Sequence, residues 1–295
     1  MKVLVVGCNG QVGSCLVKQL SIRKDVTLLA VDREKLDITN KMAVERCVNE
    51  FKPQIIINAA AYTAVDKAEH EHEQSYAINC DGPRYLAQAA TAVNAAFIHI
   101  STDYVFSGDK DGAYSESDLT APQGVYGGSK LAGEVAVSDV CDRYIILRTA
   151  WVFGEQGDNF VKTMMRLAKT RDSLGVVADQ FGGPTYAGDI AQALISIAET
   201  IIAKGEQFTN YGIYHFSGLP HVSWFEFAQV IFAKGKEQGV LKTSPSVKML
   251  TTDEYPTSAK RPANSKLDTT KITTTFGITA SDWQSALIQI RAYTE

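Results

Sequence analysis

The chain lacks the features that mark membrane, secreted and zinc-binding proteins. Its five cysteines are odd in number, scattered and without a C-x-x-C pair, which argues against a disulfide framework and against a zinc site. The opening apolar run, 3–6, is too short for a signal-peptide core, and no stretch approaches the ~20 apolar residues that span a bilayer. We therefore expect a cytoplasmic protein with no membrane partner.

Strong charge of either sign is also missing. Lys plus Arg number 29 and Asp plus Glu number 33, which gives a net charge of −4, and no run of five or more basic residues occurs. This balance argues against nucleic acid as a partner. The five histidines are isolated or lie in a charged, exposed stretch, so we expect no metal. A length of 295 residues allows one large core or two unequal domains.

Glycine is concentrated where the chain first turns. Gly7, Gly10 and Gly13 follow the apolar run 3–6 and lead into a helical segment, 14–20. Such glycines let the backbone turn tightly and approach a pyrophosphate, while the helix N-terminus attracts negative charge. Asp32 ends a second apolar run nineteen residues after Gly13, where a ribose-binding carboxylate is expected. An ordinary loop explains the glycines alone, but strand, helix and acid in register predict a dinucleotide site.

Short apolar runs then alternate with helical stretches. Runs at 55–58, 97–101 and 144–148 are rich in β-branched residues, and longer helical segments separate them, at 41–51, 72–93 and 126–139. This alternation predicts an α/β fold, a doubly wound parallel Rossmann sheet with ligands beyond the carboxyl ends of its strands. Asn58, Ser101 and Arg148 mark those ends, so the loops after them should open onto one crevice.

Tyr126 and Lys130 lie four residues apart in the last of these helical segments. Positions i and i+4 share a helix face. A lysine about 4 Å from a phenol favours the phenolate by up to ~4 kcal/mol at an effective dielectric of about 20. The pair would therefore lower the phenol pKa from ~10 toward the range useful for proton transfer. The spacing alone also arises by chance on exposed helices.

Longer motifs connect the chain to a known family. Besides the glycine fingerprint and the Tyr126/Lys130 pair, the motifs are Asn58-Ala-Ala-Ala-Tyr-Thr-Ala-Val-Asp66, Ser101-Thr-Asp-Tyr-Val-Phe106, Arg148-Thr-Ala-Trp-Val-Phe-Gly154 and Arg261-Pro-Ala-Asn-Ser-Lys-Leu267. On these residues the chain resembles the extended short-chain dehydrogenase/reductases and, among them, the dTDP-4-dehydrorhamnose reductase family. The likeness spans nearly the whole chain.

The resemblance implies a reaction and three catalytic residues. Members of the family reduce the C4 ketone of dTDP-4-dehydro-L-rhamnose with NADPH or NADH, the last step of dTDP-L-rhamnose synthesis. Tyr126 would supply the proton, Lys130 would lower the phenol pKa and hold the nicotinamide ribose, and Thr102 would hydrogen-bond the substrate oxygen. Without the other two residues, Thr102 reads more simply as a strand-end hydroxyl that caps local backbone.

The resemblance also implies the binding residues. Asp32 suits the ribose of NADH, but Arg33 could pair with the 2′-phosphate of NADPH, so the sequence leaves the preference open. Asp37 could equally be the N-cap of the helix after Thr39. The cofactor-binding set is Gly7, Gly10, Gln11, Val12, Gly13, Asp32, Arg33, Asp37, Ile38, Ala59, Ala61, Tyr62, Thr63, Tyr126 and Lys130. The substrate-binding set is Thr102, Asp103, Tyr104, Trp151, Asn159, Arg261 and Asn264.

Two domains are expected. Residues 1–150, with roughly 172–217, would form the dinucleotide-binding domain. Roughly 151–171 and 218–295 would form a smaller C-terminal domain for the dTDP-sugar substrate. Some relatives bind magnesium through glutamates at a dimer interface, where this chain has Cys15 and Gly188. We therefore expect a monomer or a weak homodimer without a magnesium bridge.

Other functions remain open. One relative of the family is a regulatory subunit that binds nucleotide without catalysis, but Thr102, Tyr126 and Lys130 argue against that function here. Reductases or epimerases acting on another nucleotide 4-keto sugar are nearer alternatives. Dehydratases usually follow the active-site Thr with Asp-Glu, whereas this chain has Asp103 and then Tyr104, which favours simple reduction.

Overall fold

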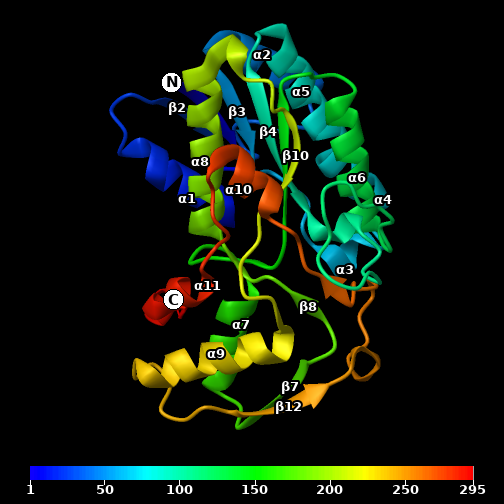
Figure 1. The fold of residues 1–295 in the computed structure, drawn as a ribbon, viewed down its shortest axis with the longest axis vertical. Helices are drawn as coiled ribbons and strands as arrows, with labels where there is room; N and C mark the ends of the chain where they lie inside the picture. The colour runs from blue at the N-terminus through cyan, green and yellow to red at the C-terminus, as the bar shows by residue number, and fades with distance from the viewer. Residues whose placement is uncertain (295) are drawn as a thin grey trace.

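A parallel sheet with helices on both faces forms the larger part of the computed structural model, which describes residues 1–294 (Figure 1). The sheet has the strand order β10-β5-β4-β3-β1-β2, and every neighbouring pair is parallel. The first five of its strands along the chain coincide with the predicted apolar runs. The strands of the sheet are β1 (Lys2–Val6), β2 (Thr27–Val31), β3 (Ile55–Asn58), β4 (Ala96–Thr102), β5 (Tyr144–Thr149) and β10 (Gly212–His215).

Both faces of this sheet are buried, which is why its strands read as continuous apolar runs rather than as alternating ones. Val3 and Val5 of β1 face a core shared with α1 (Gln11–Ser21) and α8 (Ala187–Lys204). Leu4 and Val6 point the other way, into a second core. That core is covered by α2 (Lys41–Phe51), α5 (Gly82–Ala92) and α6 (Val125–Ser138). The predicted doubly wound α/β fold is confirmed.

The strand order reverses between β1 and β3, because the chain adds β2 on one side of β1 and then β3 on the other. A doubly wound sheet binds ligands at such a switch point, beyond the carboxyl ends of the strands. The elements that follow β3 and β4 border this crevice. They are α3 (Val65–Ala68), α4 (His72–Tyr76), the π-helical turn η1 (Ala77–Asp81) and the 3₁₀ turn η2 (Asp103–Val105).

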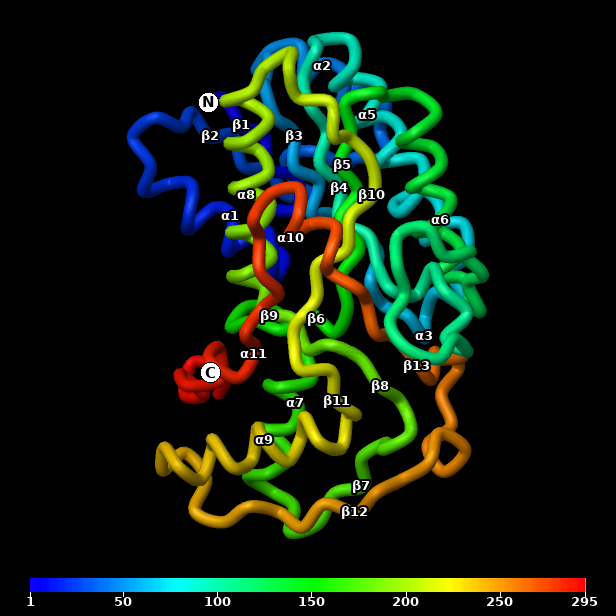
Figure 2. Tube along the Cα trace, viewed as in Figure 1, coloured from blue at the N-terminus to red at the C-terminus, as the bar shows by residue number. Residues whose placement is uncertain are grey.

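A smaller part lies beyond the carboxyl ends of the sheet strands (Figure 2). Its core joins α7 (Phe160–Ala168), α9 (Trp224–Glu237) and the parallel pair β7 (Ser173–Val177) and β12 (Ser246–Leu250). The remaining elements are short. They are β6 (Val152–Phe153), β8 (Phe181–Gly182), β9 (Thr185–Tyr186), η3 (Gly205–Gln207), β11 (Val222–Ser223), η4 (Thr252–Glu254), β13 (Asn264–Ser265), α10 (Thr270–Phe276), α11 (Trp283–Ala286) and η5 (Leu287–Tyr293).

The structure differs from the expected domain limits at two elements, β7 and α10. β7 pairs with β12 of the smaller part, so the segment from residue 172 does not yet return to the main sheet. α10 was expected in the C-terminal domain, but its Ile272 is buried in the core between the main sheet and α8. We propose that the dinucleotide-binding part comprises 1–150, 187–217 and α10. Within residues 1–294 no helix is long and apolar enough to cross a membrane.

Candidate active site

The glycine turn after β1 is so tightly packed that side chains do not fit. Gly7 has φ +79°, and a Cβ on it would lie 2.5 Å from the backbone nitrogen of Ala60. A Cβ on Gly13 would lie 2.0 Å from the carbonyl oxygen of Gly7. Gly10 is the N-cap of α1, and no side chain bonds the free N–H groups of this helix end. The helix therefore presents unpaired amide donors toward the crevice.

A first cavity of about 670 Å³ extends from this turn along the ends of β1 and β2. Asp32 lines it, with one carboxylate oxygen accepting from Lys35 N (3.1 Å) and the other from Asn9 Nδ2 (2.8 Å). These hydrogen bonds, the first above all, lower the pKa of Asp32. The predicted cofactor residues that line this cavity are Gly7, Gly10, Asp32, Arg33, Asp37, Ile38, Ala59, Ala61, Tyr62 and Thr63.

Asp37 does not cap the helix that follows it. Its carboxylate accepts from the backbone N–H (3.0 Å) and the hydroxyl (2.8 Å) of Thr39, which lowers its pKa and forms a local turn. The N-cap of α2 is Asn40, whose side chain accepts from Ala43 N. The alternative N-cap role considered for Asp37 is therefore wrong, because Asp37 lies three residues before Asn40, the residue that caps α2.

A second cavity of about 700 Å³ adjoins the first and shares with it Gly10, 59–61 and Thr63. It lies beyond β4 and β5, where α6 begins. The three predicted catalytic residues meet in its wall. The predicted residues that line it are Gly10, Gln11, Val12, Ala59, Ala61, Thr63, Thr102, Asp103, Tyr104, Tyr126, Lys130, Trp151, Asn159 and Arg261.

Thr102 hydrogen-bonds a buried carboxylate in the wall of this cavity. Its hydroxyl donates to Asp103 Oδ1 (2.9 Å) and accepts from Tyr104 N (3.2 Å). Burial raises the pKa of Tyr126 above its usual value, and the Thr102 hydroxyl offsets only part of this rise. Burial likewise raises the pKa of Asp103 to about 6. Tyr126 is therefore a protonated phenol at neutral pH.

The Lys130 ammonium lies against β4. It donates to the carbonyl oxygen of Ile100 (2.7 Å) and lies 3.4 Å from His99 Nε2. Burial lowers the pKa of Lys130 to about 8, while Glu134 one turn on raises it in part. The expected lowering of the Tyr126 pKa by Lys130 is not what this structure shows, because burial raises the pKa of the phenol and Lys130 is not among the groups that shift it.

Aromatic and cationic side chains close the far side of the second cavity. The Tyr104 ring meets the Tyr126 ring edge to face, with centroids 5.4 Å apart. Arg261 donates to Asp66 Oδ2 (2.8 Å) and reaches the Tyr104 hydroxyl (3.4 Å), so it joins the smaller part to α3. Trp151 has φ +47°, a left-handed backbone that is unusual outside glycine.

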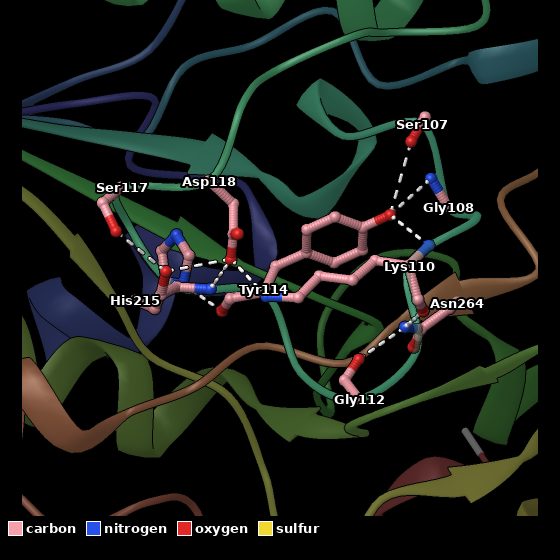
Figure 3. Close-up of polar contacts among 10 residues, drawn as sticks. Ser107, Gly108, Lys110, Gly112, Tyr114, Ser117, Asp118, His215 and Asn264 are labelled. Carbon is pink, nitrogen blue, oxygen red and sulfur yellow. Dashed lines mark hydrogen bonds and ion pairs between the residues drawn. The ribbon is translucent and has the colours of Figure 1, made fainter.

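The two predicted asparagines differ. Asn159 lines the second cavity, but its side chain caps α7 by accepting from Lys162 N and donates to Gly154 O and Gln11 Oε1. Asn264 lines neither cavity. Its amide donates to the carbonyl oxygens of Lys110 and Gly112, both at 2.6 Å, and so holds the loop around Tyr114 (Figure 3). The amide of Asn264, which was expected to bind substrate, is thus engaged in packing a loop, and Gly13 packs below the glycine turn without lining a cavity.

One buried hydrogen-bonded residue, Asn79, was not predicted from the sequence. Asn79, in the π-helical turn, accepts from Tyr62 N (2.8 Å) and donates to Tyr62 O (3.0 Å) and Ser129 Oγ (3.0 Å). It thereby ties the loop after β3 to α6, the helix that carries Tyr126 and Lys130. π-Helical turns often occur at functional sites. The extra residue that makes this turn leaves no trace in the apolar pattern, so only the folded structure reveals it.

Comparison with known proteins agrees with this geometry. The family model described as the RmlD substrate binding domain matches residues 1–294. A dTDP-4-dehydrorhamnose reductase of Aggregatibacter actinomycetemcomitans is 55% identical over 294 residues, covering 100% of this chain and 99% of the relative. The Escherichia coli K12 enzyme of that name is 40% identical over 288 residues, 96% of this chain and 95% of the relative.

Solved structures lead to the same group. A dTDP-4-dehydrorhamnose reductase of Clostridium acetobutylicum superposes with a TM-score of 0.90 at 41% identity, covering 99% of this chain and 98% of that one. The Bacillus anthracis enzyme, solved in complex with NADP, gives 0.90 at 38% identity and covers 99% of each chain. With the glycine turn and the Tyr126/Lys130 pair at adjoining cavities, these likenesses show that the chain belongs to the dTDP-4-dehydrorhamnose reductase family of NAD(P)H-dependent oxidoreductases.

Proposed function

We propose that the protein reduces the C4 ketone of dTDP-4-dehydro-L-rhamnose to give dTDP-L-rhamnose. The observation that carries this proposal is the convergence of Thr102, Tyr126 and Lys130 on one cavity that adjoins the glycine-turn cavity. The relatives of high identity bear the name of this reaction. The dTDP-sugar would occupy the second cavity, between the main sheet and the smaller part.

The residues of the first cavity fit a nicotinamide dinucleotide. Gly10 has no side chain to fill the space in front of the uncapped end of α1, which suits a pyrophosphate. Asp32 and Arg33 lie together in the lining, where they would meet the adenosine ribose. When bound, the reduced cofactor supplies a hydride to the ketone carbon.

Tyr126 would donate the proton that completes the alcohol. Its raised pKa keeps the phenol protonated at neutral pH, as a general acid requires. Thr102 would hydrogen-bond the ketone oxygen as negative charge develops on it. Lys130 would hold the nicotinamide ribose, and its positive charge would stabilise the phenolate that remains after proton transfer. Tyr104, Trp151 and Arg261 would contact the sugar and the diphosphate.

The test is a spectrophotometric assay with enzymatically prepared keto-sugar. We expect oxidation of NADPH or NADH at 340 nm for the wild type, with about a thousandfold or greater loss of kcat in Tyr126→Phe. The dissociation constant for the cofactor should stay within about threefold of wild type, because the phenol is not needed to anchor the dinucleotide.

A matched control is Tyr85→Phe, which also removes a phenol hydroxyl but lies outside both cavities. It should keep wild-type turnover. Binding of cofactor without reduction of any nucleotide 4-keto sugar would contradict the proposal and favour a regulatory role. Preferential reduction of another 4-keto sugar would contradict only the choice of substrate.

A further inference from the structure

A buried chain of polar side chains joins Lys130 to the loop that separates the two cavities. His99 is fully buried on β4, and its two ring nitrogens face different partners. Nε2 lies 3.4 Å from Lys130 Nζ, and Nδ1 lies 3.1 Å from the side-chain nitrogen of Asn58 on the neighbouring strand. Asn58 Oδ1 in turn accepts from the backbone N–H of Ala60 (3.1 Å), which lines both cavities.

The hydrogen bonds of Asn58 fix where the proton of His99 lies. The backbone N–H of Ala60 can only donate, so the atom that faces it must be the amide oxygen. The amide NH₂ then faces Nδ1 and donates to it, so Nδ1 must carry a lone pair. Burial, and then the charge of Lys130, lower the pKa of His99 well below 6.5, so the ring is neutral and its one proton lies on Nε2.

This arrangement suits only one protonation state of Lys130. A proton on Nε2 can be donated to the lone pair of a neutral Lys130 amine. If Lys130 is an ammonium, two donors face each other and no hydrogen bond forms. If Lys130 is an ammonium, the ring hydrogen-bonds it only with a lone pair on Nε2 and its proton on Nδ1. The amide of Asn58 must then turn over, so that its oxygen accepts from Nδ1 and its bond with Ala60 is lost.

We propose that His99 is a positioning residue whose tautomer, set by Asn58, couples the proton of Lys130 to the loop at Ala60. When Lys130 takes up one proton, His99 remains neutral and its own proton moves from Nε2 to Nδ1. The pair is thus a two-state element inside the sheet, and it senses whether the catalytic lysine is charged. The link between this coupling and catalysis rests on the proposed function, in which Lys130 stabilises the Tyr126 phenolate. The coupling itself does not depend on it.

The other ionisable groups around Lys130 are few. On α6 they are Tyr126 and Glu134, one turn to either side, and Glu134 is ion-paired with the buried Arg148 of β5 (2.6 Å). η2 contributes Asp103, which bonds Thr102. The pKa of Lys130, about 8, lies within the pH range where the protein can be titrated, so its charge and the tautomer of His99 should change together.

The direct test is an NMR titration of the protein with ¹⁵N-labelled histidine, without cofactor or substrate. The ¹⁵N shifts distinguish protonated from unprotonated ring nitrogens, and His99→Gln assigns the signals among five histidines. Above the Lys130 pKa of about 8 we expect the proton on Nε2, and below it on Nδ1. A single tautomer from about pH 6.5 to about 9.5 would overturn the inference.

Two variants separate this coupling from an ordinary pH effect. Lys130→Met removes the charge, and the tautomer of His99 should then stay the same at every pH. Lys41→Met, which removes an exposed lysine of α2, should leave the change intact. Persistence of the change in Lys130→Met contradicts the proposal. If that variant does not fold, ¹³C-labelled lysine in the wild type replaces it, and the Lys130 and His99 midpoints must coincide within about 0.3 pH unit.

The outcome is independent of the reduction assay. A tautomer change that follows Lys130 in a protein without reductase activity would leave this inference standing and refute the proposed function. An active reductase in which His99 keeps one tautomer would support the proposed function and refute this inference.

Discussion

At the scale of single residues, Asp103 costs the fold stability. Burial raises its pKa from 3.8 to about 6, so the folded state binds this proton more tightly than the unfolded state. The contribution of Asp103 to the free energy of unfolding is therefore most favourable below about pH 4 and falls as the pH rises from about 4 to about 6. Two pKa units correspond to a loss on the order of 3 kcal/mol above that range.

Asp103→Asn should remove this loss. We expect the variant to unfold at higher urea than wild type at pH 8, by up to about 2 kcal/mol, and to gain little at pH 4.5. Asp111→Asn, at an exposed position, serves as the control and should change the free energy of unfolding by less than about 0.5 kcal/mol at both pH values. An equal effect of Asp103→Asn at both values would show that ionisation is not the cause.

Substitutions in the glycine turn should separate the effect on cofactor binding from the effect on folding. A Cβ on Gly10 would lie 3.4 Å from Gly7 O, an acceptable contact, but it would project where the pyrophosphate is expected. Gly10→Ala should therefore keep its thermal midpoint within about 2 °C and bind NADPH at least about tenfold more weakly by fluorescence titration. Gly13→Ala places a Cβ 2.0 Å from the same oxygen, so it should lose both stability and binding. Tight binding by Gly10→Ala would place the pyrophosphate elsewhere.

At the scale of elements, α6, the helix that carries Tyr126 and Lys130, is fixed to β5 by a buried ion pair. Glu134 and Arg148 are each 3% exposed and lie 2.6 Å apart, and Ser101 also donates to the carboxylate. Glu134→Gln leaves the guanidinium buried without its charge partner, which should destabilise the fold by about 3–5 kcal/mol in urea unfolding. Glu45→Gln breaks an exposed pair with Lys41 and should cost less than about 0.5 kcal/mol. If both variants lost the same free energy of unfolding, the buried Glu134–Arg148 pair would not be what fixes α6 to β5.

The sequence predicted the elements of the main sheet well and those of the smaller part poorly, for a physical reason. Strands buried on both faces read as apolar runs, and the 3–6 and 55–58 runs became β1 and β3. β12 has mixed burial and pairs with a strand far away in the chain, so no local pattern indicates it. The same difference explains the site. Tyr126 and Lys130 follow from spacing along one helix, whereas His99 and Asn58 meet only through strand register.

At the scale of the whole molecule, the second cavity depends on contacts between its two parts. Trp151, in the loop after β5, stacks on Trp224 at the start of α9, with ring centroids 3.5 Å apart and planes within 7°. Gly182 lies against the Trp151 ring, since a Cβ there would approach it to 2.5 Å. A left-handed backbone costs about 1–2 kcal/mol outside glycine, so this packing must hold Trp151 in place.

Trp224→Ala should therefore weaken binding of the nucleotide sugar while leaving the cofactor site intact. Trp224 lines neither cavity, and its effect passes through the Trp151 ring. We expect KM for the keto-sugar to rise about tenfold, because an aromatic pair contributes up to about 1.4 kcal/mol, which corresponds to a tenfold change. The NADPH dissociation constant should stay within about twofold of wild type. Trp224→Phe keeps part of the stacking, so its KM for the keto-sugar should lie between those of wild type and Trp224→Ala. A parallel loss of both affinities would mean that the smaller part supports the whole fold rather than the sugar site alone.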